Sequence, residues 1–241
     1  MNNYNIINLS EIDSTNNYTF TLKDTSLFKE GLVITTKYQT AGRGYFGNIW
    51  ESEKAKNIII SILIEPKIHV DKIFDISKLA SLTLIDFLLS KGLNSQIKWP
   101  NDILVNSKKI AGILIQNIIS NNTVTHSVIG LGLNVNQMVF KRYSPLATSL
   151  KLEANKDFNL VDIQKSILNY FDNRLNDYRS KNTLNNNYLN ALFQKDKLVF
   201  FKSESKKFKG IIRGINDSGL LQVESDDLVK EYDIKDIKMI F

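Results

Sequence analysis

Apolar residues recur along this chain at two spacings, one typical of helices and the other of strands. Residues 71–89 and 160–179 carry apolar side chains at helical spacing, which predicts two helices that each bury one face. Ser14, with Tyr18 and Leu22 behind it, predicts the start of a shorter helix. Strands are predicted by apolar and β-branched runs at 5–9, 31–39, 57–64, 110–115 and 123–136, and by a run that ends at Pro100. A short helix over 188–193 and a loop over 142–150 are also expected.

The spacing of apolar residues changes to two near residue 196. Short alternating runs follow, separated by turn-forming residues at 216–219 and 225–227. Five short strands in so few residues predict a small SH3-like β-barrel. The chain is therefore expected to divide into a larger unit over residues 1–194 and a C-terminal unit over 195–241.

Composition excludes several kinds of chemistry. The 241 residues suffice for one core and a small appended unit. The chain has no cysteine and only two histidines, His69 and His126, so a thiol nucleophile, a zinc centre and histidine-based acid–base catalysis are not expected. The net charge of +6 suits an anionic substrate, an acidic partner or a nucleic acid. Neither a leader sequence nor a membrane-spanning stretch is evident, so we expect a cytoplasmic protein without membrane contact.

A glycine-rich segment lies between two predicted strands. Gly42, Gly44 and Gly47 have the spacing G-x-G-x-x-G, but a strand follows them where a dinucleotide-binding motif requires a helix. Together with Arg43 and Trp50, they predict a flap that closes over a phosphate or a carboxylate. The alternative is an ordinary long hairpin loop.

A second candidate site lies in residues 98–116. Pro100 should end a strand, which leaves Asn101 and Asp102 at the strand end, and Lys109 enters the next apolar run just before Gly112. A lysine beside a glycine that admits a ligand is a candidate anion site. Lys108 and Lys109 are equally well explained as solvated turn residues.

Glycine also interrupts the run at 123–136. Gly130 and Gly132 should lie on one face of their strand, where they can form the floor of a flat pocket beside Gly112, and Asn134 follows them. At the other end of the chain, Ser14 lies where a strand meets a helix. Such a junction can bind a small polar group, although capping its own helix is the simpler role.

In combination, these segments resemble the biotin protein ligase family. The matching stretches, in order, are STN at 14–16, YQTAGRGYFGNIW at 38–50, KWPNDI at 98–103, KKIAGILIQ at 108–116 and GLGLNVN at 130–136. The resemblance implies an α+β fold in which helices flank a mixed β-sheet, as in class II synthetases and lipoate ligases, followed by an SH3-like C-terminal domain.

The resemblance also implies roles for individual residues. Biotin would be bound by Ser14, Thr15, Asn16, Gln39, Gly42, Arg43, Trp50, Lys109, Gly112 and Gly130. ATP would be bound by Gly44, Tyr45, Asn101, Asp102 and Asn134. Lys109 and Arg43 would be catalytic, because both hold the reacting carboxylate and phosphate. No metal site within the protein is assigned, and Mg²⁺ is expected to enter with ATP, on the side of Asp102.

The implied reaction joins biotin and ATP into biotinyl-5′-AMP and pyrophosphate. The biotin then passes to a lysine of a biotin carboxyl carrier protein domain in a biotin-dependent carboxylase. This chemistry needs fixed cations and Mg²⁺ more than acid–base residues, which fits the composition. The rivals are a lipoate or octanoate ligase and a nucleic-acid-binding module.

Two departures from the family pattern affect these expectations. Tyr45 and Asn48 stand where many members carry arginines that order the flap, which predicts a flap that retains the intermediate less well. Few residues precede the first predicted strand, so a short form without the winged-helix domain of the regulatory members, and without DNA binding, is expected. Members of this class often pair through the central sheet, so a homodimer is a further expectation.

Overall fold

The computed structural model describes residues 4–181, 184–203 and 206–240. Its larger sheet has the strand order β1-β2-β3-β8-β7-β6-β5, and β4 pairs with β8. These strands are β1 (Asn5–Leu9), β2 (Leu32–Thr36), β3 (Ile58–Ile64), β4 (Ile68–His69), β5 (Ser95–Lys98), β6 (Asp102–Val105), β7 (Lys108–Ser120) and β8 (Thr123–Leu133). Only β1 and β2 pair in parallel, so the predicted mixed sheet is confirmed.

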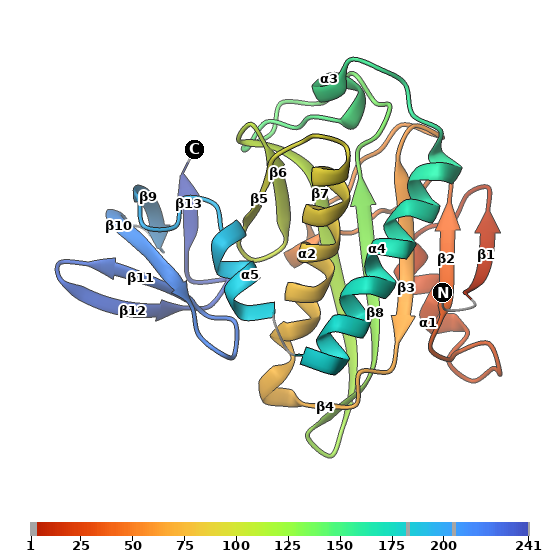
Figure 1. Ribbon diagram of the computed structural model, residues 1–241, viewed down its shortest axis with the longest axis horizontal. Helices are drawn as coiled ribbons and strands as arrows, with labels where there is room; N and C mark the ends of the chain where they lie inside the picture. The colour runs from red at the N-terminus through yellow and green to blue at the C-terminus, as the bar shows by residue number, and fades with distance from the viewer. Residues whose placement is uncertain (1–3, 182–183, 204–205, 241) are drawn as a thin grey trace.

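Helices cover the two faces of this sheet unequally. They are α1 (Thr15–Thr21), α2 (Phe74–Ser90), α3 (Leu150–Ala154), α4 (Leu160–Lys181) and α5 (Leu184–Ala191). The long helices α2 and α4 pack side by side over one face, where the main core lies (Figure 1). A smaller cluster on the opposite face packs Leu32 and Ile34 against Tyr18 of α1. Because α1 is short, much of that second face is left for the candidate site.

The structure shifts several predicted boundaries. Helix α2 begins at Phe74, later than expected, because Val70–Lys72 form a separate 3-10 turn. Helix α5 begins and ends earlier than predicted, at Leu184–Ala191. The predicted loop over 142–150 is confirmed up to Ser149, and the unpredicted helix α3 begins at Leu150, where the Ser149 side chain caps it. This helix is too short to show a periodic pattern. None of the helices in the described part of the chain is both long and apolar enough to span a bilayer.

The C-terminal unit is a sheet of five antiparallel strands, as the alternating pattern predicts. It comprises β9 (Leu198–Ser203), β10 (Lys206–Ile215), β11 (Leu221–Ser225), β12 (Leu228–Tyr232) and β13 (Lys238–Ile240), in the order β12-β11-β10-β9-β13. Among the described residues, no pairing joins the edge strands β12 and β13. The five predicted strands are therefore confirmed, but they form an antiparallel sheet in which no closed barrel is found over the described part of the chain.

This smaller sheet packs directly on the larger unit (Figure 1). Phe201 and Val223 belong to the same core cluster as the residues of α2. The indole Nε1 of Trp99 donates a hydrogen bond to the carbonyl oxygen of Gly219 over 2.8 Å. Gly219 has a φ of +88°, and a Cβ there would lie 2.2 Å from the Phe74 ring, so only glycine fits this contact. The two predicted units thus share one core, and the division at residue 194 stays a prediction.

Candidate active site

A cavity of about 780 Å³ lies over the glycine-bearing part of β7 and β8. It is large enough for a small-molecule substrate. Besides strands of the larger sheet, four parts of the chain line it: the start of α1, the flap that connects β2 to β3, residues 98–102, and the C-terminal sheet. The residues of the lining that were predicted as site residues are Ser14, Thr15, Asn16, Gln39, Arg43, Gly44, Tyr45, Trp50, Asn101, Asp102, Lys109, Gly112 and Gly130.

Gly112, Gly130 and Gly132 lie on one sheet face and line the cavity, as predicted. Gly112 is the direct partner of Gly132 in the pairing of β7 with β8. A Cβ at Gly132 would lie 2.5 Å from the indole of Trp50, and a Cβ at Gly130 would lie 2.5 Å from Oδ1 of Asn16. The glycines therefore line the cavity, as predicted, and they also make room for side chains of the same chain.

Trp50 closes the flap onto this face. The flap is a narrow hairpin in which Trp50 N–H donates to the Gly42 carbonyl over 3.0 Å, and Gly44 N–H donates to the Asn48 carbonyl over 2.7 Å. A Cβ at Gly42 would lie 2.4 Å from the Trp50 carbonyl oxygen, so this glycine shapes the flap and does not line the cavity. The indole Nε1 of Trp50 is buried and has no hydrogen-bond partner among the described residues. Because a buried donor without a partner costs free energy, this position of Trp50 is one that the flap can leave.

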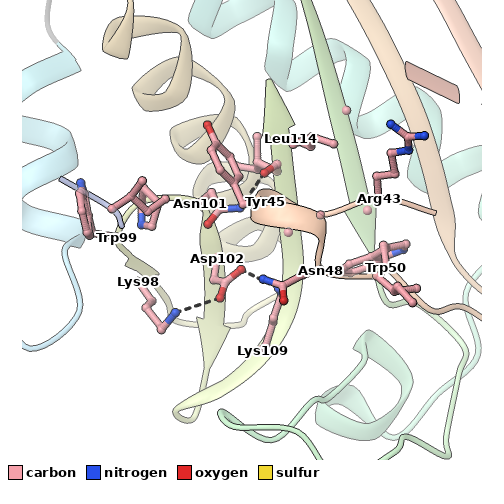
Figure 2. A pocket seen from close by; sticks show the side chains of 18 of the residues that line it. Arg43, Tyr45, Asn48, Trp50, Lys98, Trp99, Asn101, Asp102, Lys109 and Leu114 are labelled. Atoms are coloured by element: carbon pink, nitrogen blue, oxygen red, sulfur yellow. Dashed lines mark hydrogen bonds and ion pairs between the residues drawn. The ribbon is translucent and has the colours of Figure 1, made fainter. Parts of the chain in front are cut away.

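The cations of the site converge on one carboxylate. Asp102 receives the ammonium group of Lys109 at 2.6 Å on one oxygen and that of Lys98 at 3.1 Å on the other (Figure 2). Burial alone would raise the pKa of Asp102, but the two ammonium groups outweigh burial and hold the pKa below its ordinary value. The Lys109 ammonium also lies 5.6 Å from the centre of the Trp50 ring. With 30% of its side chain exposed, Lys109 keeps access to the cavity.

A buried polar network occupies the end of the cavity near α1. Gln39 accepts hydrogen bonds at Oε1 from the Thr15 amide over 2.8 Å and from the Thr15 hydroxyl over 3.1 Å. Asn16 donates to Gln116 Oε1 over 2.9 Å and accepts from the Ser61 hydroxyl over 2.6 Å. Neither Ser61 nor Gln116 was predicted as a site residue, although each is a polar interruption in an apolar strand.

Three predicted site residues, Arg43, Asn101 and Asn134, do not take part in the pair of Lys109 and Asp102. The guanidinium group of Arg43 is exposed and points away from the pair of Lys109 and Asp102 (Figure 2). Asn101 donates to the carbonyl of Ile113 over 2.8 Å and so joins β6 to β7. Asn134 is buried outside the cavity lining and donates to the Thr148 carbonyl over 2.9 Å. Their ligand contacts therefore stay predictions.

One end of the cavity lies between the larger unit and the C-terminal sheet. Lys98, Trp99 and Pro100 line it on the side of the larger unit. On the other side, the C-terminal sheet contributes Phe201, Lys202, Leu221 and residues 234–239. Lys98, Trp99 and Pro100 belong to the candidate site predicted over 98–116, whereas no sequence signal marked the residues of the C-terminal sheet, because a contact between two units depends on how the units pack.

The donor set does not fit a metal held by the protein. The described residues contain no group of three or more histidine or acidic side chains that could bind a metal ion. Both oxygens of Asp102 are already engaged by ammonium groups. A divalent cation would therefore need most of its ligands from a substrate.

Comparison with known proteins agrees with this geometry. Residues 9–134 match the model of the Biotin/lipoate A/B protein ligase family, so the chain belongs to that family. It is 29% identical to the bifunctional ligase/repressor BirA of Bacillus subtilis over 219 residues, which cover 87% of this chain and 66% of BirA. The chain thus spans just under two thirds of that relative.

Two further likenesses concern the biotin branch of the family. A biotin--[acetyl-CoA-carboxylase] ligase of Mycobacterium tuberculosis is 33% identical over 126 residues, covering 50% of this chain and 45% of that protein. The solved biotin protein ligase of Aquifex aeolicus in complex with biotin and ATP has a TM-score of 0.75 at 23% identity, covering 98% of each chain. This second likeness supports the fold.

Proposed function

We propose that this protein is an ATP-dependent biotin protein ligase. In the first step, a carboxylate oxygen of biotin forms a bond to the α-phosphorus of ATP, and pyrophosphate leaves. In the second step, an acceptor lysine attacks the acyl carbon of biotinyl-5′-AMP, and AMP leaves as biotinyl-lysine forms. The acceptor is a biotin carboxyl carrier protein domain of a biotin-dependent carboxylase.

The observation that carries this proposal is the position of the Lys109 ammonium group. It lies between the carboxylate of Asp102 and the indole of Trp50, beside Gly112. The first step brings together two anions that repel each other, and a fixed cation between them lowers that barrier. Lys109 can serve both anions once it leaves Asp102.

Lys98 makes it possible for Lys109 to leave Asp102. A lone buried aspartate would hold its single ammonium partner tightly, because separation would leave an uncompensated charge. Lys98 stays 3.1 Å from Asp102 Oδ2 when Lys109 moves, so the carboxylate remains paired. Asp102 and Lys98 are therefore positioning residues for Lys109 in this proposal.

The polar network near α1 is suited to the ureido ring of biotin. A urea has a carbonyl acceptor and two N–H donors, so it needs both kinds of partner. The buried residues Ser14, Thr15 and Asn16, with Gln39, offer hydroxyl and amide groups at one end of the cavity. Arg43 is proposed to reach the adenylate when the flap closes. Gly44, Tyr45, Gly112 and Gly130 are proposed to contact the substrates through the backbone or flap. Gly42 is proposed to shape the flap, and Asn101 and Asn134 to shape the ATP side.

Mg²⁺ is proposed to enter as MgATP, where it would neutralise phosphate charge. The pairing of Asp102 with two lysines argues against the earlier placement of the ion at that residue. A homodimer and a cytoplasmic location stay predictions.

Biotin transfer to a purified carrier domain in the presence of MgATP tests the function. The wild type is expected to release pyrophosphate and label the carrier domain. Lys109→Ala should lose at least about 100-fold in rate, since removal of one preorganised electrostatic group typically costs this much. Lys108→Ala is the matched control, because Lys108 is the exposed neighbour and forms only a long ion pair of 3.9 Å with Glu153. A folded Lys109→Ala protein with wild-type activity would refute the mechanism.

A lipoate or octanoate ligase is the second candidate, since the family includes lipoate ligases. The polar end of the cavity favours biotin, because a ureido ring can form hydrogen bonds with those groups whereas a dithiolane or alkyl chain cannot. Calorimetric titration separates the two: binding of biotin without binding of lipoate is expected, and the reverse would favour the rival.

A further inference from the structure

Lys109 faces the cavity because its strand contains a β-bulge. Lys109 and Gly112 are three positions apart in β7, and residues three apart project from opposite faces of a regular strand. A Cβ at Gly112 would nevertheless lie 3.3 Å from Cε of Lys109, so both residues lie on the cavity face. The register of β6 with β7 shifts here and leaves Ile110 as an extra residue between Lys109 and Ala111. A bulge of this kind re-aims the side chain beside it.

The backbone of Lys109 pairs with a segment outside the named strands. Strand β8 ends at Leu133, and residues 146–148 take the position beside Lys109. The Lys109 N–H donates to the Leu146 carbonyl over 2.7 Å, and the Thr148 N–H donates to the Lys109 carbonyl over 2.8 Å. The position of this segment therefore helps to set the direction of the Lys109 side chain.

Asn134 joins the bulge to this segment. It is the first residue after β8 and is only 4% exposed. Its N–H donates to the carbonyl of Ile110, the extra residue of the bulge, over 2.9 Å. Its Nδ2 donates to the Thr148 carbonyl over 2.9 Å, and its own carbonyl accepts from the Leu150 N–H over 3.1 Å. Asn134 thus contacts both backbone features that orient Lys109, although it lies outside the cavity lining.

Helix α3 holds the same segment from the other side. The Thr148 hydroxyl donates to Glu153 Oε1 over 2.6 Å. Asn106, in the turn between β6 and β7, donates to Glu153 Oε2 over 2.7 Å. These contacts close a ring around the bulge, in which Asn134 is the member that touches both the bulge and the segment.

We propose that Asn134 is a positioning residue for Lys109, which holds the bulge and the segment 146–148 together so that the ammonium group points into the cavity. The inference rests on the proposed function, in which Lys109 serves the reacting carboxylate and the α-phosphate. This role differs from contact with ATP, because the side-chain amide already donates to the Thr148 carbonyl.

Asn134→Ala removes the donor to the Thr148 carbonyl and leaves that carbonyl without this partner. We expect kcat for pyrophosphate release to fall by about 10- to 100-fold, since misplacement of a reacting group by about 1 Å can cost roughly 100-fold. The KM values for ATP and biotin should change little, because Asn134 touches neither substrate in this role.

Asn136→Ala is the matched control. Asn136 lies two residues further along and binds the backbone of Phe158 through two hydrogen bonds of 2.8 and 3.0 Å. The control therefore removes a comparable tie between side chain and backbone, away from Lys109. Thermal unfolding should show similar losses of stability in the two alanine variants, whereas kcat should fall only in Asn134→Ala.

Asn134→Asp keeps the shape of the side chain and tests the donor itself, including when the alanine variant does not fold. An ionised carboxylate cannot donate to the Thr148 carbonyl, whereas the protonated acid can. Burial raises the pKa of such a carboxyl. The ratio of the kcat of this variant to that of the wild type should therefore be low at high pH and rise as the pH falls.

The pKa of Asp102, measured by carbon NMR, reads the position of Lys109 without any turnover. Because the Lys109 ammonium helps to hold the pKa of Asp102 down, this pKa should be higher in both Asn134 variants at high pH and unchanged in Asn136→Ala. A wild-type kcat in folded Asn134 variants would overturn the proposal. So would a raised KM for ATP at constant kcat, or an unchanged pKa of Asp102. If the wild type releases no pyrophosphate from biotin and ATP, the proposed function fails instead, and the pKa of Asp102 alone decides the positioning role.

Discussion

Two lysine–aspartate pairs of nearly equal length differ in how far water reaches them. Lys78 lies 2.8 Å from Asp75 on α2, and the exposed fractions of these side chains are only 2% and 7%. Lys109 lies 2.6 Å from Asp102 at the cavity, with exposed fractions of 30% and 11%. Distance alone does not distinguish a structural ion pair from one that can exchange partners.

The surroundings of each pair explain the difference. The Lys78 ammonium also donates to Asn185 Oδ1 on α5, and the Tyr178 hydroxyl of α4 donates to Asp75, so the pair joins three helices. At the cavity, Asp102 has Lys98 as a second cation, and the Lys109 ammonium lies beside the ring of Trp50. The Lys78–Asp75 pair is enclosed by protein, and we call it the closed pair. The Lys109–Asp102 pair, which we call the open pair, has room to accept a substrate anion.

The largest expected effect is on the closed pair. Lys78→Met leaves the Asp75 charge buried without a cation, which should lower the free energy of unfolding by about 3–5 kcal/mol. Urea titration measures this loss. Asp75→Leu/Lys78→Met removes both charges and should recover most of the stability. A single variant as stable as the wild type would show that the pair is not structural.

The open pair should respond in activity. Asp102→Asn leaves Lys109 without its positioning partner, and misplacement of a reacting group by about 1 Å can cost roughly 100-fold in kcat. We expect a loss of this order in pyrophosphate release, partial rescue by Asp102→Glu, and little change in the KM for biotin. Asp157→Asn, in the exposed pair with Lys151, is the control. Equal losses in both variants would contradict the role of Asp102.

Acid should remove the stability that the Asp102 carboxylate contributes through the open pair. The folded-state pKa of Asp102 lies below the ordinary value of 3.8, so the carboxylate contributes stability above that value and loses it as the pH falls through the folded pKa. The stability difference between the wild type and Asp102→Asn should therefore be constant near neutral pH and shrink below about pH 3.8. Urea titrations across this range measure it, and a difference that grows in acid would contradict the pairing.

The smallest expected effect concerns the indole ring of Trp50, which lies beside the open pair. Gly132→Ala places a Cβ 2.5 Å from the Trp50 indole and should displace that ring. We expect a stability loss of about 1–3 kcal/mol, as for other overpacked sites, and a red-shifted Trp50 emission in a Trp99→Phe background. Gly44→Ala is the milder control, because its nearest neighbour would lie at 3.4 Å. Unchanged emission would show that Trp50 is not held against the sheet.

Local patterns predicted the elements well, whereas contacts across the chain were harder to foresee. Alternation and glycine spacing were enough to place Gly112 beside Gly132, because sheet register follows the face that must be buried. The same reasoning missed that Trp50 and Asn16 fill the space over these glycines. It also missed the C-terminal wall of the cavity, since alternation within a sheet does not specify what the sheet packs against.

The pKa of Asp102, measured by carbon NMR with and without a non-hydrolysable biotinyl-5′-AMP analogue, tests most directly whether Lys109 changes partners. The account predicts that the analogue raises the pKa of Asp102 in the wild type, because the Lys109 ammonium moves to the ligand. In Lys109→Met, the pKa should already be raised before the analogue is added. A wild-type pKa that stays constant or falls on binding would contradict the account.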